Sequence, residues 1–489
     1  MSKRRSTREF DQPGDVVGRR ADHSRFFPAW RFVAFYAVLL LCIPSRLIIG
    51  PIGAPGTPAN LFAIAGLLWW VCSVVGGLNP RRGLSPIRVT VGLFTVCVLT
   101  SFVSGHLAGW YQPADIHQRS DRLWRAQTAA ELAVTIGSAA DRGLLAMAGW
   151  IGVALIAAEA IRSWRELERV IAWVVGAATF VASLGILQYF TGVNLAGYLM
   201  IPGLTPLSSF GAALSRSDLN RVVSTSGHPI ELGVIMAALL PLALHRSLYS
   251  TKRITWVPTL LIGLTALMSV SRSAIVVAAV ALLVMFLGWP NRWRLAALIA
   301  APIAGVIGPV ALPGLLGTIR SLFTNLEDDP SVAGRTDDYE LVSRLVEERL
   351  FFGQGLFTFI PMIYRTIDNQ ALVIMLELGI IGAIVFATLI VVGIFCSLTP
   401  RWSGESNQNR HLGLAVAASL LGIVISYFTF DALGFRQVAG MTFLLVGLTG
   451  AVWHLTRDSM RQREEAEHQS AEAPDRKPNS SQATKQSDA

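Results

Sequence analysis

The sequence predicts an all-α polytopic membrane protein of about 12 transmembrane helices, with a large extracytoplasmic loop that contains an amphipathic helix. Of its 489 residues, 52% are hydrophobic and only 15% are charged, whereas ordinary globular chains are roughly 25% charged. Its mean hydropathy is +0.50. Many apolar stretches approach the roughly 20 residues that a bilayer core requires. This composition excludes a soluble enzyme, and the net charge of +9 does not indicate a nucleic-acid partner.

The apolar stretches follow one another with short polar separations. We place helices near 30–49, 60–78, 87–104, 142–161, 168–190, 229–249, 254–270, 273–289, 293–310, 367–397, 411–430 and 436–455. The polar, basic segment before the first helix carries no convincing cleavage site, so the first helix is expected to be an uncleaved anchor.

Every second connector is short and carries arginine or lysine, and this alternation predicts how the chain is oriented in the membrane. Short connectors that carry positive charge (79–88, 162–169, 245–253, 290–294 and 400–410) alternate with connectors at 50–59, 105–141, 191–228, 271–272, 311–366 and 431–435. Positively charged loops stay in the cytoplasm, so both termini are expected there. The resulting division is a basic tail over 1–27, a transmembrane domain over 28–456, and a polar tail over 457–489 that lacks aromatic residues and is expected to be disordered.

Three outward segments, 105–141, 191–228 and 311–366, are longer than a simple connection needs. The last contains apolar residues at helical spacing, at Leu341, Val342, Leu345 and Val346. This pattern predicts an amphipathic helix that lies against the membrane or the bundle. The glycines of Phe351-Phe352-Gly353-Gln354-Gly355 would end it and allow a ligand to approach closely.

Several charged residues fall where a membrane makes them rare. Arg272 lies in the tight turn Ser271-Arg272-Ser273, Asp368 lies at the mouth of the tenth helix, and Glu377 lies nine residues further in. Charges at such depth are usually functional or paired with each other. The alternatives are that Arg272 anchors a helix end to lipid headgroups and that Glu377 is structurally paired.

These residues belong to motifs that resemble the O-antigen ligase and polymerase family of bacterial membrane glycosyltransferases. The motifs are Met268-Ser269-Val270-Ser271-Arg272-Ser273-Ala274, Gly334-Arg335, Leu350 to Gly355, Asp368-Asn369-Gln370-Ala371-Leu372, and Glu377-Leu378-Gly379-Ile380-Ile381-Gly382. Ser226-Gly227-His228-Pro229-Ile230-Glu231 also resembles the start of a helix in exopolysaccharide polymerases. One departure stands out, because O-antigen ligases usually have a His-Asn pair where this chain has Asp368-Asn369.

The resemblance implies an inverting glycosyltransferase, independent of metal and cofactor, in the inner (cytoplasmic) membrane. It would transfer a glycan from an undecaprenyl-pyrophosphate-linked donor to a hydroxyl of a saccharide or glycolipid acceptor at the outer face, as a polymerase or a ligase. The adjacent pairs Asp328-Asp329 and Asp337-Asp338 diverge on a helix and do not form a metal site. The alternatives are a transporter or flippase of the lipid-linked saccharide, and a non-catalytic assembly protein.

Such a reaction needs cations for the diphosphate leaving group. Arginine suits this role because its planar fork binds phosphate oxygens bidentately and keeps its charge. We expect Arg272, Arg335 and Arg221 to bind the pyrophosphate. Arg344 is a further supporting residue, since its spacing to Gly355 resembles one in O-antigen polymerases.

The reaction also needs a base that takes the proton of the acceptor hydroxyl. We choose Asp368, with Asn369 and Glu377 as supporting residues, because a carboxylate can replace the imidazole of the family. Asp368 could instead cap the tenth helix. His228 is the second candidate base, although it precedes Pro229 and could be a structural cap. Glu231 is expected to support the site by pairing with Arg221.

Overall fold

The protein is a bundle of α-helices with two very short strand pairs. The computed structural model describes residues 28–77, 85–108, 129–207, 215–216, 219–311, 330–361, 363–364 and 366–472. The α-helices are α1 (Trp30–Cys42), α2 (Pro58–Val75), α3 (Pro86–Leu107), α4 (Ala129–Ala160), α5 (Trp164–Thr191), α6 (Pro229–Leu248), α7 (Trp256–Met268), α8 (Arg272–Gly288), α9 (Asn291–Ala311), α11 (Pro330–Glu348), α12 (Gln370–Leu398), α13 (Asn407–Ile425) and α14 (Arg436–Glu472).

Short elements lie in the connectors. Strand β1 (Leu47–Ile48) pairs antiparallel with β2 (Thr205–Pro206), and β3 (Ser215–Arg216) pairs antiparallel with β4 (Leu219–Asn220). The single-turn helices are η1 (Ala54–Gly56), η3 (Leu195–Tyr198), η4 (Arg253–Thr255), η5 (Thr399–Arg401) and η6 (Ser426–Phe428).

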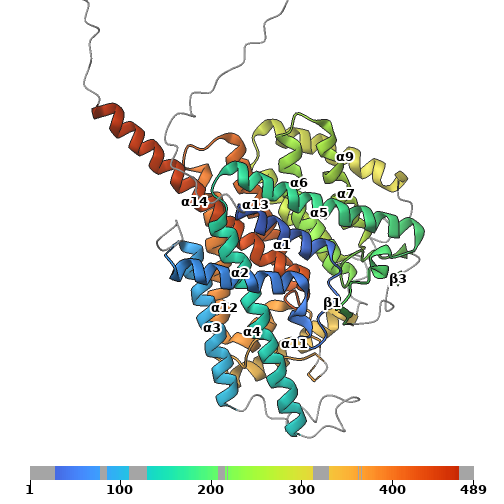
Figure 1. The fold of residues 1–489 in the computed structure, drawn as a ribbon. Helices are drawn as coiled ribbons and strands as arrows, with labels where there is room; N and C mark the ends of the chain where they lie inside the picture. Colours follow the sequence, from blue (N-terminus) through green and yellow to red (C-terminus); the bar gives the residue numbers. More distant parts are fainter. Residues whose placement is uncertain are drawn as a thin grey trace, which may run out of the picture.

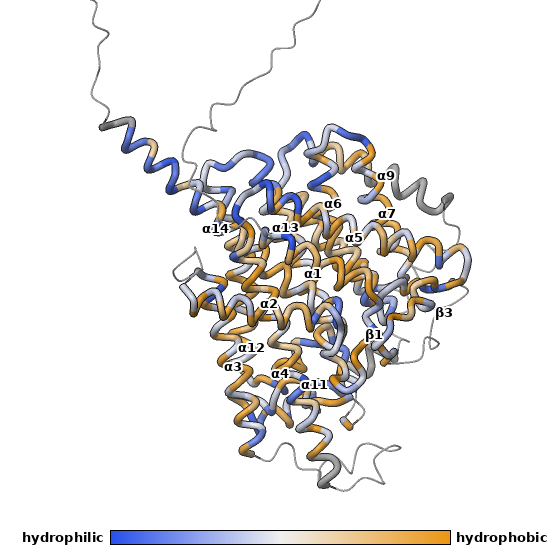
Figure 2. The backbone as a smooth tube through the Cα atoms, viewed as in Figure 1, coloured by the Kyte–Doolittle hydropathy of each residue, from blue (hydrophilic) through white to orange (hydrophobic). Residues whose placement is uncertain are grey.

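Every apolar range predicted from the sequence contains a helix. Within the described residues, eight helices are long and apolar enough to cross a membrane, namely α2, α3, α4, α5, α6, α12, α13 and α14. Helices α1, α7 and α8 are apolar but shorter. The bundle is hydrophobic along its helices and hydrophilic mainly in the connectors (Figure 2). The chain is therefore an integral membrane protein with several crossings, whereas the number 12 stays a prediction.

Close helix contacts use small residues. Helix α14 packs along α4, and a Cβ added at Gly447 would lie 2.6 Å from the Ala154 carbonyl oxygen. Trp150 of α4 stacks on Phe443 of α14 with ring centroids 5.1 Å apart. Small residues let helix backbones approach where lipid supplies no hydrophobic drive between helices.

The connectors gather at two ends, joined by helices such as α6. One end carries the described connectors 43–57, 221–228, 269–271, 353–361, 366–369 and 429–435, and we call it the site end. Contacts such as Ser45 N to Thr225 O at 2.8 Å and Gln370 N to Phe430 O at 3.2 Å hold these connectors together. The other end carries 161–163, 249–255, 289–290 and 399–406, and we call it the basic end. The site end therefore brings together described parts of several connectors that the sequence predicts to be outward.

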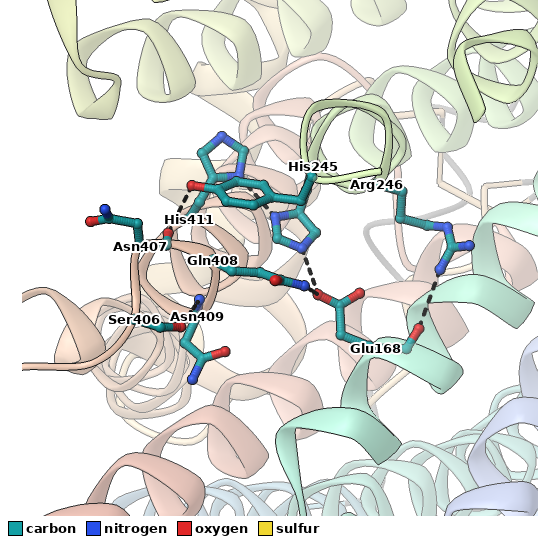
Figure 3. A network of polar contacts seen from close by, with 9 residues as sticks. Glu168, His245, Arg246, Ser406, Asn407, Gln408, Asn409 and His411 are labelled. Atoms are coloured by element: carbon teal, nitrogen blue, oxygen red, sulfur yellow. Dashed lines mark hydrogen bonds and ion pairs between the residues drawn. The ribbon is translucent and has the colours of Figure 1, made fainter. Parts of the chain in front are cut away.

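A chain of hydrogen bonds joins the ends of several helices at the basic end, and Figure 3 shows the part made by Glu168, His245 and His411. His245 of α6 lies 2.8 Å from both Glu168 of α5 and His411 of α13. Trp289, which follows α8, donates from Nε1 to Nε2 of His411 at 2.8 Å. These side chains fix the helix ends relative to one another.

Two differences from the sequence prediction concern a long connector and the tail. Helix α4 begins at Ala129, which shortens the predicted loop 105–141. Helix α11, in contrast, covers the predicted amphipathic segment and buries Leu341 and Val342. The sequence predicts disorder from residue 457, but α14 continues to Glu472 (Figure 1). The reason is that Arg, Gln, Glu and Ala extend a helix already nucleated in the core. Residues 1–27 and 473–489 lie outside the described residues.

Candidate functional site

His228 caps the first turn of α6 at the site end. Its Nδ1 accepts a hydrogen bond from the Ile230 backbone N–H at 3.2 Å, which satisfies one of the free donors of the helix start. Burial, together with the nearby Arg221 and Arg46, lowers the pKa of His228 to about 4. The imidazole is therefore neutral at pH 7 and carries its proton on Nε2. The lone pair that a base would need is already used in the cap.

Glu231, one turn further along α6, is completely buried and organises the connectors around it. Its Oε2 accepts from Ser45 Oγ at 3.2 Å and from Gly227 N at 2.6 Å. Its Oε1 accepts from the backbone N–H of Gln437 at 2.9 Å. The carboxylate thus joins the starts of α6 and α14 to the segment after α1, whereas its pairing with Arg221 stays a prediction.

Arg221 and Arg272 lie at the turn between α7 and α8. Arg221 Nε donates to the Ser269 carbonyl oxygen at 3.2 Å, and Arg272 is the first residue of α8, after the cap Ser271. Val270 between them has a φ of +48°, which a β-branched residue adopts only when its surroundings enforce it. Helix α6 packs closely against this turn, because a Cβ added at Gly233 of α6 would overlap the Ser269 side chain.

Helix α12 is broken inside its apolar length. Gly379 has a φ of +68° within the helix, and the segment 350–355 supplies the hydrogen bonds that the break leaves open. Gly355 N donates to the Glu377 carbonyl at 2.8 Å, and Ile380 N donates to the Leu350 carbonyl at 2.8 Å. A Cβ at either Gly353 or Gly379 would overlap the opposing backbone. The glycine motif, which the sequence predicts to let a ligand approach, therefore lets the backbone of α12 approach segment 350–355 closely.

Glu377 is buried at this break. Its Oε1 accepts from the Phe359 backbone N–H at 3.3 Å, while Ser101 Oγ of α3 donates to the Glu377 backbone carbonyl at 2.5 Å. Phe357 in the same loop has a φ of +63°. An irregular backbone at membrane depth is tolerated where protein or a cavity surrounds it.

Asp368 lies half-buried just before α12, and the cap of that helix is its neighbour. Asn369 Oδ1 accepts from the backbone N–H groups of Ala371 at 3.0 Å and Leu372 at 3.3 Å. Asn369 therefore fills the capping role considered above for Asp368. Burial and the negative charge of Asp368 raise the pKa of Asp431 to about 6. The two carboxyl groups thus form an electrostatically coupled pair.

A cavity of about 310 Å³ opens at the site end, between α1, α4, α12, α14 and the segments 54–57, 357–361, 366–367 and 431–434. Its polar lining includes Arg142, Gln370, Glu377, Asp431 and Arg436, and its aromatic lining includes Tyr36, Trp150, Phe357 and Phe359. A concave site with a few converging polar groups is a common form of ligand site.

The structure does not bring all the sequence-predicted residues to this cavity. Glu377 lines it, and Asp368 lies beside its wall through Asp431. His228, Glu231, Arg221 and Arg272 form a neighbouring cluster around the start of α6. Arg344 lies exposed on α11, where it pairs with Glu340 at 3.8 Å, and the side chain of Arg335 on the same helix lies outside the described residues.

Sequence reasoning missed Arg142, Asp431 and Arg436. Arg142 lies within α4 and Asp431 lies in a connector, both without a recognisable motif, and Arg436 begins α14. The detectable signal was their position in the sequence, since all three fall at or beside the predicted outward ends of the ranges 142–161 and 436–455 in a chain with few charges. Among the residues that the structure describes, no His, Cys, Asp and Glu side chains group in threes or more around a possible metal position.

Comparison with known proteins identifies one segment. Residues 257–387 match the family model described as O-antigen ligase. The match begins in α7, ends in α12, and includes Arg272, Asp368 and Glu377. No curated protein matches the chain. Residues 257–387 are thus similar to the O-antigen ligase family, as the motifs there predict, and this similarity supports a role in glycan ligation.

Proposed function

We propose that this member of the O-antigen ligase family transfers a glycan from an undecaprenyl-pyrophosphate-linked donor to an acceptor hydroxyl at the outer face of the cytoplasmic membrane. The observation that carries the proposal is the O-antigen ligase match over residues 257–387. The placement of Asp368 and Glu377 at a cavity that has several charged and polar lining groups supports it.

Arg272 and Arg221, with Arg335, stabilise the diphosphate leaving group. In the reaction the acceptor oxygen bonds to the anomeric carbon, and the bond from that carbon to the diphosphate oxygen breaks. Negative charge grows on the departing diphosphate, so positioned guanidinium groups lower the barrier. Attack opposite the leaving group inverts the anomeric configuration. The contact of Arg221 with the Ser269 carbonyl supports this role, because it holds the Arg221 guanidinium at the turn that precedes α8, the helix that begins with Arg272.

Asp368 receives the proton of the acceptor hydroxyl. Two features favour it over His228. The His228 Nδ1 lone pair accepts the Ile230 N–H, and the pKa of His228 near 4 makes it a weak base. Asp368, in contrast, leaves the capping of α12 to Asn369 and lies near the carboxyl group of Asp431, which lines the cavity.

The experiment is transfer by purified protein in lipid vesicles, with a lipid-linked oligosaccharide donor and a separate acceptor. A ladder of products indicates a polymerase, and a single adduct indicates a ligase. Arg165, exposed in the first turn of α5 at the basic end, gives a matched control as Arg165→Ala. No product together with movement of the intact donor across the vesicle membrane would favour the transporter and end the proposal.

A further inference from the structure

Two arginines from distant parts of the chain converge on one short connector. Arg142 of α4 packs on Gly53, since a Cβ added there would lie 3.2 Å from the Arg142 Nε. Gly53 has a φ of +76°, so glycine both forms the turn and leaves room for the guanidinium. Arg436 Nε donates to the carbonyl of the next residue, Ala54, at 3.2 Å. Two positive groups thus meet at residues 53–54, on the wall of the cavity.

Neither guanidinium is neutralised by an ion pair within the described part of the chain. Arg436 Nη1 donates to the Ser45 carbonyl at 2.9 Å, which is a neutral acceptor. Glu231 attracts Arg436 electrostatically, but its oxygens are already bonded to Ser45, Gly227 and Gln437. The like charge that acts on Arg436 is the nearby Arg46, which adds to the positive potential at this wall. An anion in the cavity would offset these positive charges.

The rest of the cavity suits a sugar. Trp150 and Tyr36 present aromatic surface, and Glu377, Asp431 and Gln370 offer hydrogen-bonding groups for hydroxyls. At about 310 Å³ the cavity is at the lower end of ligand sites, which span roughly 300 to 1,000 Å³. It therefore fits a sugar end group and not a polyprenyl chain.

We propose that Arg142 and Arg436 bind a phosphate carried by the acceptor saccharide. The assignment rests on the proposed function, in which the donor diphosphate is held by Arg221 and Arg272 at the neighbouring cluster. The acceptor belongs in the cavity because Asp431, the coupled partner of the base Asp368, lines the same wall. Two separate arginine clusters then bind the two anionic substrates, one the donor and the other the acceptor.

Arg142→Gln is the cleaner test, because Arg436 also holds the connectors through Ser45 and Ala54. With a phosphorylated acceptor, the variant should raise the acceptor KM at least about tenfold, as expected for one lost charge-assisted contact, and leave the donor KM unchanged. With the same acceptor lacking phosphate, the variant and the wild type should behave alike. Arg142→Lys should recover part of the loss, and Arg165→Gln should cause none.

A rise in the donor KM alone would place the donor diphosphate in this cavity and overturn the assignment, as would equal losses with both acceptors. Binding without donor separates this proposal from the proposed function. Wild-type protein should bind a hexose phosphate more tightly than the same hexose, and Arg142→Gln should abolish that difference. This result would support the anion site even if no glycan were transferred; equal binding of both sugars by the wild type would contradict it.

Discussion

The two ends of the bundle differ in how completely their polar groups are paired. At the basic end the donors and acceptors complete one directional chain. Trp289 donates to Nε2 of His411, so the His411 proton is on Nδ1 and faces Nδ1 of His245, whose own Nε2–H then donates to Glu168. In this arrangement all four imidazole nitrogens have a hydrogen-bond partner.

The site end leaves its groups incomplete. Arg142 and Arg436 meet beside a cavity without an ion pair among the described residues, and the carboxyl groups of Asp368 and Asp431 lie near one another. The non-glycine residues with positive φ in the described chain, Ser224, Val270 and Phe357, all belong to connectors of this end. Satisfied polar networks give rigidity, whereas strain and uncompensated charge mark functional sites. This difference supports the proposal that the basic end stabilises the bundle and that the site end carries the chemistry.

The largest expected effect is loss of transfer in Asp368→Ala and Arg272→Ala. Removing the base or one leaving-group cation should lower the turnover rate by at least about 100-fold, while the protein still inserts into the membrane. Initial rates in vesicles, normalised to inserted protein, measure this. Normal rates in the Arg272 variant would contradict the leaving-group role.

Next comes the break in α12. Gly379→Ala should destabilise the protein by about 3 kcal/mol or more. The position has a φ of +68°, which disfavours any side chain, and a Cβ there would overlap the Phe351 backbone. Thermal unfolding in detergent measures the effect. Gly92 of α3 is a matched control, since a Cβ there meets open space, and Gly92→Ala should be neutral or slightly stabilising.

The raised pKa of Asp431 predicts a pH dependence. The folded protein keeps the Asp431 proton up to about pH 6, whereas the unfolded chain releases it near the usual pKa of 3.8. The folded state therefore binds more protons between these values, and stability falls as the pH rises through them, by about 3 kcal/mol in total. Asp431→Asn should remove this contribution, so the difference in stability between variant and wild type should grow from pH 4 to pH 6. A difference that stays constant with pH would exclude the raised pKa.

A smaller effect is expected at the basic end. His411→Ala leaves Trp289 Nε1 and His245 Nδ1 without partners and should cost about 2 kcal/mol of stability. The turnover per folded molecule should stay close to that of the wild type. Gln408→Ala, which removes a more exposed bond to Glu168, should cost less. A turnover defect in folded His411→Ala protein would break the division between the two ends.

Hydropathy and motifs predict the helices and the family well, because a bilayer imposes a strong length and composition signal. Arg272, Asp368 and Glu377 could also be predicted as candidates from the sequence, since each lies in a motif or is a rare charge near an apolar helix. Arg142, Asp431 and Arg436 were not, because only folding brings the start of α14 and the middle of α4 to the connector 53–54. Likewise, the partners of Glu231 come from sequence separations that no local pattern encodes.

The central claim is that the site end performs glycan transfer with Asp368 as the base. The most direct measurement is the transfer rate of purified wild-type, Asp368→Asn and His411→Ala proteins, at matched folded amounts, with a lipid-linked donor. The account predicts product with the wild type and His411→Ala, and at least about 100-fold less with Asp368→Asn. Equal rates for Asp368→Asn and the wild type would contradict it.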